Sequence, residues 1–243
     1  MCLRLAALSA LLVCSSASVA ASECVILLHG LARTSSSMAR MQDALIDAGF
    51  ETINVDYPSR HHPIEELAPI ALESGLSGCR AIEGIERVHF VTHSLGGILV
   101  RQYLAENEIP ELGRVVMLAP PNQGSVAADR LRNVPGFEWM NGPAGSQLGK
   151  GEESVPLQLG PADFELGVIA GNRSIDPIAS AVLPNPEDGR VTVDDTKLDG
   201  MSDFIVVDHS HAFIMRMRKT IELTLGFLKT GRFSADEAGS EAG

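Results

Sequence analysis

Positive charge is scarce in this chain of 243 residues, which has 19 Lys and Arg against 31 Asp and Glu and a formal net charge of −12. Phosphate contact needs clustered cations, and no basic patch is dense enough to indicate nucleic-acid binding. The acidic balance is that of a solvated surface. With 45% hydrophobic and 21% charged residues, the composition excludes disorder of the whole chain and favours one large domain.

Apolar runs long enough to span a bilayer are also lacking. The run from Leu5 to Val13 has about nine residues, whereas a crossing needs about 20. Arg4 precedes this run and small residues follow it as far as Ala21, which predicts a secretory signal peptide over residues 1–21. An uncleaved anchor, a misassigned start and a lipid-modified Cys14 stay open as alternatives. The sequence therefore predicts export to the periplasm or secretion.

Cysteine is rare as well, with four in the chain. Cys2 and Cys14 would leave with the signal, and an even pair, Cys24 and Cys79, would remain. In an oxidising compartment such a pair predicts one disulfide, with two unrelated buried thiols as the alternative. His61 and His62 have no partner at metal-ligand spacing, so we expect no metal and no cofactor.

Apolar segments of strand length alternate with segments of helical periodicity, which predicts an α/β fold with a doubly wound, mostly parallel sheet. The predicted strands are 24–28, 51–55, 87–92, 114–118, 166–170 and 204–207. The predicted helices are 37–48, 64–76, 95–106 and a closing helix, 212–228, with an apolar stripe of Phe213, Met217, Ile221, Leu225 and Leu228.

Two segments, 120–161 and 171–203, interrupt this alternation and read as irregular. Long irregular insertions in a compact domain are usually functional loops or lids. We therefore expect a domain over 22–233 with a loop-rich, lid-like insertion at about 120–161, followed by a flexible acidic tail at 234–243. Phe137, Trp139 and Met140 would either give the insertion an apolar face or pack beneath it.

The string Val91-Thr92-His93-Ser94-Leu95-Gly96-Gly97 stands where a predicted strand meets a predicted helix. A nucleophile elbow needs this context and small residues two positions before and after the serine. Gly96 satisfies the second requirement, whereas Thr92 stands where the motif has glycine. The free N–H groups of the following helix would point at the reaction centre. We therefore predict Ser94 as a nucleophile, with slightly more room at the elbow than usual.

His29-Gly30-Leu31 follows another buried strand, at the same edge of the sheet. Ligands of open α/β sheets bind at the carboxyl ends of the strands. The N–H groups of Leu31 and Leu95 would form an oxyanion hole. His29 would organise the loop rather than transfer protons.

The acid and the base of such a site should follow late strands, in the order Ser, Asp, His. Among Asp176, Asp188, Asp194, Asp195 and Asp208, the spacing favours Asp188, because Gly189 permits a tight turn after it. His209 and His211 both follow the last strand. The pattern favours His211 and leaves His209 open.

The chain resembles α/β-hydrolases of the bacterial lipase and esterase branch. The matching blocks are HGLARTSSSM at 29–38, VTHSLGGILVRQYL at 91–104, LAPPNQGS at 118–125, PEDGRVTV at 186–193 and HSHAFIM at 209–215. The resemblance implies that Asp188 is the acid of the catalytic triad and that His211 is its base.

These observations predict hydrolysis of a carboxylic ester, carried by a small molecule or a lipid, through an acyl-enzyme on Ser94. The same triad would serve an acyltransferase or a thioesterase, and a secreted non-catalytic protein with this fold is a further alternative. Transient contact with a lipid surface stays open, and the sequence makes no prediction of the oligomeric state.

Overall fold

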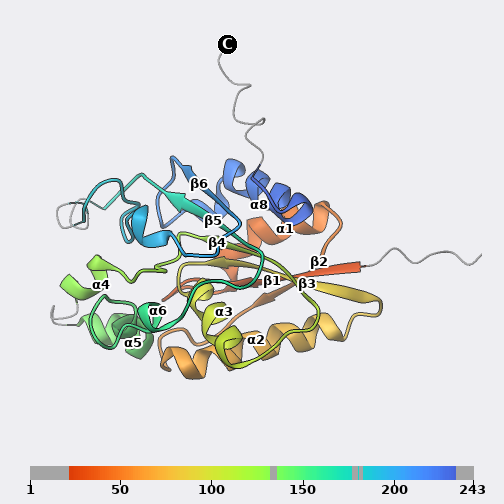
Figure 1. Ribbon diagram of the computed structural model, residues 1–243, viewed down its shortest axis with the longest axis horizontal. Coiled ribbons are helices and arrows are strands. Elements are labelled where there is room, and N and C mark those ends of the chain that lie inside the picture. Colours follow the sequence, from red (N-terminus) through yellow and green to blue (C-terminus); the bar gives the residue numbers. More distant parts are fainter. Residues whose placement is uncertain (1–21, 132–135, 177–179, 181–182, 234–243) are drawn as a thin grey trace, which may run out of the picture.

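The computed structural model describes residues 22–131, 136–176, 180 and 183–233, so the predicted signal peptide and acidic tail lie outside the described residues (Figure 1). At its centre is a parallel sheet of six strands in the order β2-β1-β3-β4-β5-β6. The strands are β1 (Ser22–Leu28), β2 (Glu51–Val55), β3 (Ile85–His93), β4 (Leu112–Leu118), β5 (Leu166–Gly171) and β6 (Asp203–Val207). The predicted α/β class is confirmed.

Strand β1 shows why the sheet is buried on both faces. Its side chains alternate between two apolar clusters, with Cys24, Ile26 and Leu28 in one and Val25 and Leu27 in the other. All five are fully buried, as the continuous apolar run predicts for a central parallel strand.

Helices cover both faces of the sheet (Figure 1). Helices α2 and α3 contribute to the first cluster, and α1 and α8 contribute to the second. The helices and 3₁₀ turns are η1 (Ser35–Met38), α1 (Ala39–Asp47), α2 (Ile64–Arg80), α3 (Leu95–Glu106), α4 (Val126–Leu131), α5 (Phe137–Gln147), α6 (Val155–Gln158), η2 (Asp194–Thr196), η3 (Ile214–Arg216) and α8 (Arg218–Thr230).

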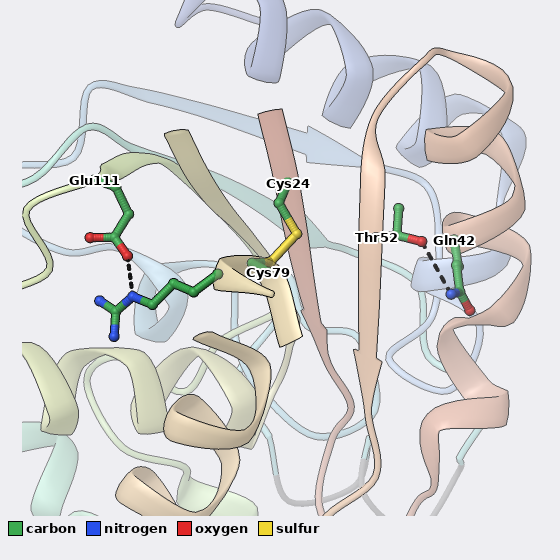
Figure 2. The surroundings of a disulfide bond; sticks show 6 residues. Cys24, Gln42, Thr52, Cys79 and Glu111 are labelled. Carbon is green, nitrogen blue, oxygen red and sulfur yellow. Dashed lines mark hydrogen bonds and ion pairs between the residues drawn. A yellow bond between two sulfur atoms is a disulfide. The ribbon is translucent and has the colours of Figure 1, made fainter. Parts of the chain in front are cut away.

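Helix α2 lies very close to β1 and β2. A Cβ atom at Gly75 would lie 2.6 Å from the Ile26 side chain, so only glycine allows this approach. One turn further along, Cys79 forms a disulfide with Cys24 of β1, with the two Cα atoms 5.9 Å apart (Figure 2). Both cysteines are fully buried, and the bond fixes the amino end of β1 to the end of α2.

Two predicted features differ from the structure. Met217 is extended, with φ −81° and ψ 134°, so the closing helix is divided into η3 and α8. Phe213 therefore leaves the predicted apolar stripe and is 48% exposed. The insertion at 120–161 is also less irregular than predicted, because it contains α4, α5 and α6. Helix α5 is kinked at Gly142, and proline lies at the start of α6, where a helix tolerates it.

The strand order indicates where on the sheet a ligand would bind. The chain passes from β1 to β2 on one side and then to β3 on the other, so the connections diverge between β1 and β3. Such a divergence leaves a crevice at the carboxyl ends of the strands.

Within the described ranges, no helix combines the length and apolar character needed to cross a membrane.

Candidate active site

Ser94 lies in a strained turn between β3 and α3. Its backbone has φ 52° and ψ −117°, a conformation that residues with a side chain rarely adopt and that costs about 1–3 kcal/mol. The N–H of Ser94 donates to the carbonyl of Leu118 at 2.9 Å, which secures the turn against β4. Ala32 after β1 and Ala119 after β4 also have positive φ, so the strain is gathered at adjoining strand ends.

The close approach of α3 to β1 explains the glycine after the serine. A Cβ atom at Gly96 would lie 2.8 Å from the carbonyl oxygen of Leu28 and 3.1 Å from that of His29. These are backbone atoms that cannot move aside. The first turn of α3 therefore rests directly on the end of β1.

Thr92, the departure from the usual elbow pattern, is accommodated by Gly97. Thr92 is fully buried and donates a hydrogen bond to the carbonyl of Val116 at 3.4 Å. A Cβ atom at Gly97 would come within 3.2 Å of the Thr92 hydroxyl and 3.0 Å of the Met117 sulfur. The room that Thr92 needs is thus supplied by the missing side chain at position 97.

The side chains of Ser94, His211 and Asp188 form a continuous hydrogen-bond chain. Nε2 of His211 lies 3.0 Å from Oγ of Ser94, and Nδ1 of His211 lies 2.8 Å from Oδ2 of Asp188. The Asp188 side chain is fully buried, and that of His211 is 12% exposed. Since the carboxylate accepts the Nδ1 proton, Nε2 is left to accept the proton of the serine hydroxyl.

The turn after Asp188 fixes the orientation of the carboxylate. Oδ1 accepts hydrogen bonds from the N–H groups of Arg190 at 3.0 Å and Val191 at 2.8 Å. Gly189 has φ 100° and makes this tight turn possible. The carbonyl of Asp188 accepts the N–H of His211 at 2.9 Å, so the acid and the imidazole are also joined through the backbone.

The other candidate acids and the other candidate base lie elsewhere. His209 makes no hydrogen bond to Ser94 or Asp188, although all three residues are in the described part of the chain. The remaining aspartates pair with cations: Asp176 with Arg190, Asp194 with Lys197, Asp195 with Lys150, and Asp208 with Arg173.

His29 and Gly30 shape the loop that faces the serine. The His29 ring is buried and stacks on Tyr57, with the ring centroids 4.1 Å apart. Its Nδ1 contacts the carbonyl of Gly30 at 2.9 Å, and its Nε2 accepts the N–H of Tyr57 at 3.3 Å. Burial lowers the pKa of His29, which keeps the ring neutral in this role. These contacts are those of a residue that organises the loop.

The predicted oxyanion donors belong to the elbow and to the loop after β1. Leu95 is the first residue of α3, and Leu31 follows Gly30, where a Cβ atom would lie 3.3 Å from Cβ of Ser94. The next two N–H groups of the loop are used locally, since that of Ala32 donates to Oγ of Ser59 and that of Arg33 donates to the carbonyl of Gly30.

His93 contributes to the site but was not singled out by the sequence patterns. Its Nε2 donates to the carbonyl of His211 at 3.0 Å, and the two rings lie 4.8 Å apart. Burial, followed by the nearby charges of His211 and Arg33, holds the pKa of His93 well below its usual range. The signal that could have identified it is its place directly before Ser94, on a fully buried strand end.

The insertion is fastened to the body of the domain at several points. Arg101 of α3 is buried and donates to five oxygens, which belong to Asn122, Pro156, Leu159 and Gly160. Gln147 of α5 accepts the N–H of Ile64 at 2.7 Å and so caps α2. These bonds hold both ends of the insertion and its middle helix.

The apolar face predicted for the insertion is only partly described. Trp139 of α5 is 84% exposed and therefore does not pack beneath the loop. The side chains of Phe137 and Met140 lie outside the described residues. Gly145 of α5 lies against Leu31, since a Cβ atom there would be 3.2 Å from the leucine side chain. The insertion thus reaches the loop beside the serine.

In the described part of the chain, no group of three or more His, Cys, Asp or Glu side chains is placed to hold a metal ion. His62 instead contacts the Glu66 carboxylate at 2.8 Å.

Comparison with solved structures shows similar folds at low sequence identity. The mature form of the Bacillus licheniformis lipase BlEst2 is 19% identical, with a TM-score of 0.70 over 86% of this chain and 93% of that one. Phospholipase PlaB from Legionella pneumophila is 20% identical, with a TM-score of 0.70 over 88% of this chain and 61% of that one. A thermophilic esterase from Thermogutta terrifontis is 17% identical, with a TM-score of 0.57 over 86% of this chain and 90% of that one.

A search of curated protein sequences finds no match. The model of the Alpha/beta hydrolase family, in contrast, matches residues 25–214, a range that includes Ser94, Asp188 and His211. This range is most of the chain, and it ends just beyond the last residue of the hydrogen-bond chain. The protein belongs to the alpha/beta hydrolase family.

Proposed function

We propose that the protein is a serine hydrolase that cleaves carboxylic esters through an acyl-enzyme on Ser94. The observation that carries this proposal is the hydrogen-bond chain from Ser94 through His211 to Asp188, with distances of 3.0 and 2.8 Å. Such a chain couples a nucleophile to a base and the base to an orienting acid. The folds of known lipases and esterases, which resemble this one, agree with it.

In the proposed reaction, Oγ of Ser94 attacks the carbonyl carbon of the ester as His211 takes the hydroxyl proton at Nε2. His211 then gives this proton to the leaving alcohol, which yields the acyl-enzyme. Water attacks the acyl group in the same manner, and the acid is released. Asp188 holds Nδ1–H and stabilises the imidazolium that forms in each step.

The N–H groups of Leu31 and Leu95 are the proposed donors to the oxyanion. Each such donor typically contributes about 3 kcal/mol to stabilising the tetrahedral intermediate. The elbow at Ser94 and the loop after Gly30 are both held by backbone hydrogen bonds, so these donors need little reorganisation during the reaction. His93 is a positioning residue in this scheme, because it binds the carbonyl of His211.

Export of the protein is also a proposal, and the buried Cys24–Cys79 disulfide supports it, since disulfides persist in oxidising compartments. The exposed Trp139 is the described residue best suited to transient contact with a lipid surface.

The test is hydrolysis of 4-nitrophenyl esters of short and long acyl chains by the wild type, Ser94→Ala and Ser36→Ala. Ser36 is an exposed serine in the η1 turn. Its variant therefore shows the effect of removing a serine hydroxyl at a position other than Ser94. We expect Ser94→Ala alone to lose activity and labelling by a fluorophosphonate. Activity that survives in Ser94→Ala would refute the proposal. Mass analysis of products formed with added alcohol or thiol separates hydrolysis from acyl transfer.

A further inference from the structure

A hollow of about 360 Å³ lies beside the proposed oxyanion loop. Its walls come from the turn after β1 and the loop after β2, and its polar lining comprises Arg33, Thr34, Asp56, Ser59, Arg60 and His61. Tyr57, which stacks on His29, forms a further part of the wall. The lining begins three residues after Gly30, and a Cβ atom at Gly30 would lie 3.3 Å from Cβ of Ser94.

Arg33 connects this hollow with the proposed catalytic base. Its Nη2 donates to the carbonyl of Ala212 at 3.1 Å, directly after His211 in the chain. In the described ranges no carboxylate lies within 4.0 Å of its guanidinium, in contrast to Arg190, which is paired with Asp176 at 3.3 Å. The cation is partly buried, and a neutral carbonyl is its hydrogen-bond partner.

A second cation without a carboxylate partner in the described ranges, Arg216, is anchored at the same turn. Its Nε donates to the carbonyl of Ser37 at 3.5 Å, and Ser37 in turn donates to the carbonyl of Thr34 at 2.8 Å. Burial, and after it the positive charges of Arg216 and Arg190, lower the pKa of Arg33. The arginines are thus close enough to repel one another.

Asp56 does not neutralise this group of cations. One of its oxygens accepts the N–H of Ser35 at 2.9 Å and lies 3.5 Å from Nε2 of His29, while the side chain is 64% exposed. The hollow therefore has two arginines, Arg33 and Arg60, against one carboxylate, in a chain whose formal net charge is −12. Uncompensated cations beside a reaction centre are the arrangement that recognises an anion, because guanidinium groups bind carboxylate and phosphate strongly.

We propose that the ester substrate carries an anionic group, a carboxylate or a phosphate, that binds in this hollow against Arg33. This inference rests on the proposed function and specifies its substrate class. Arg60 adds a second positive charge to the lining, and Thr34 and Ser59 lie within the same wall. Arg216 lies outside the lining and adds its charge near Arg33. The anion would relieve the repulsion among the arginines while the ester carbonyl lies at Ser94.

The test compares two matched pairs of substrates that differ in one charge. The first pair is 4-nitrophenyl hydrogen glutarate and 4-nitrophenyl valerate, which place the charge on the acyl side. The second pair is 3-acetoxybenzoate and 3-acetoxybenzamide, which place it on the alcohol side. We expect the wild type to favour the anionic member of at least one pair by about tenfold or more in kcat/KM, as one hydrogen bond between charged groups provides.

Arg33→Gln should remove this preference, mainly through KM, and raised salt should reduce it in the wild type. The matched control is Arg87→Gln, an exposed arginine near the start of β3, at the opposite end of the strand from Ser94, which should keep the preference. Inorganic phosphate should inhibit the wild type more strongly than Arg33→Gln.

Equal rates within both pairs for the wild type would overturn the inference and leave the proposed function intact. Equal losses on both members of a pair in Arg33→Gln would also overturn it, since they would show that Arg33 only supports the loop of His211. No hydrolysis of any ester that depends on Ser94, the neutral esters included, would instead refute the proposed function and this inference with it.

Discussion

Replacing Asp188 by asparagine tests the proposed hydrogen-bond chain at its most deeply buried member. Oδ1 of Asp188 accepts two N–H groups, those of Arg190 and Val191, so the amide oxygen of an asparagine must take that position. The amide NH₂ would then face Nδ1 of His211, where Oδ2 now lies at 2.8 Å. A donor at this place forces Nδ1 to accept, and the ring proton moves to Nε2.

With a proton on Nε2, His211 cannot accept the hydroxyl proton of Ser94. We expect kcat/KM for a 4-nitrophenyl ester to fall by about 10⁴-fold, the size of loss that this tautomer change causes in a serine protease triad. That factor corresponds to about 5.4 kcal/mol of transition-state stabilisation. The two N–H groups keep an acceptor, so the variant should remain folded, which thermal unfolding will show.

Asp208→Asn is the matched control. Asp208 also follows a strand and precedes a histidine, but its side chain is 73% exposed and contacts Arg173. We expect its activity to stay within about twofold of the wild type, since exposed ion pairs contribute little. A loss below tenfold for folded Asp188→Asn, or an equal loss in both variants, would refute the reasoning about the tautomer.

Three further predictions concern stability. Burial lowers the pKa values of His29 and His93, so the unfolded chain binds more protons than the folded chain near and below the ordinary histidine pKa. The midpoint of thermal unfolding should therefore fall as the pH drops below about 6.5. A midpoint that stays constant down to about pH 5 would contradict this. Arg101→Met should lower the free energy of unfolding, measured in urea, by about 3 kcal/mol. Five oxygens lose a hydrogen-bond donor at about 1 kcal/mol each, and removal of a buried cation offsets part of this loss. A loss under about 1 kcal/mol would show that water replaces the guanidinium. Joint replacement of Cys24 and Cys79 by serine should lower the free energy of unfolding by about 4 kcal/mol, which is the loop-closure entropy for a separation of 55 residues. An unchanged urea unfolding curve would count against this.

The sequence predicts best those strands and helices whose apolar spacing and end residues lie within the element itself. Strand β2 and helix α3 have the predicted bounds, because an apolar period and clear end residues mark them. The closing helix was predicted as one element because its apolar spacing continues through Met217, and the extended backbone there depends on tertiary packing. The helices of the insertion were missed because glycine and proline usually indicate loops, whereas here they lie at a kink and at a helix start.

The site shows the same division between local and distant information. Ser94 could be proposed as a nucleophile from the sequence because strand, turn and helix are contiguous in the chain. The pattern favoured His211 but could not exclude His209, because the choice depends on which ring reaches Ser94 and Asp188 in the folded chain. The roles of His93 and Arg101 depend wholly on partners far along the chain, His211 in one case and the ends of the insertion in the other.

The close packing of Thr92 against Gly97 affects how nucleophile elbows can be recognised in other sequences. A Cβ atom at position 97 would lie 3.2 Å from the Thr92 hydroxyl and 3.0 Å from the Met117 sulfur, so a side chain there would require these neighbours to shift. We therefore expect a chain with threonine two positions before the serine to keep glycine at the position of Gly97. A search pattern that demands glycine before the serine will pass over chains like this one, whereas a pattern of correlated sizes at the two positions would retain them.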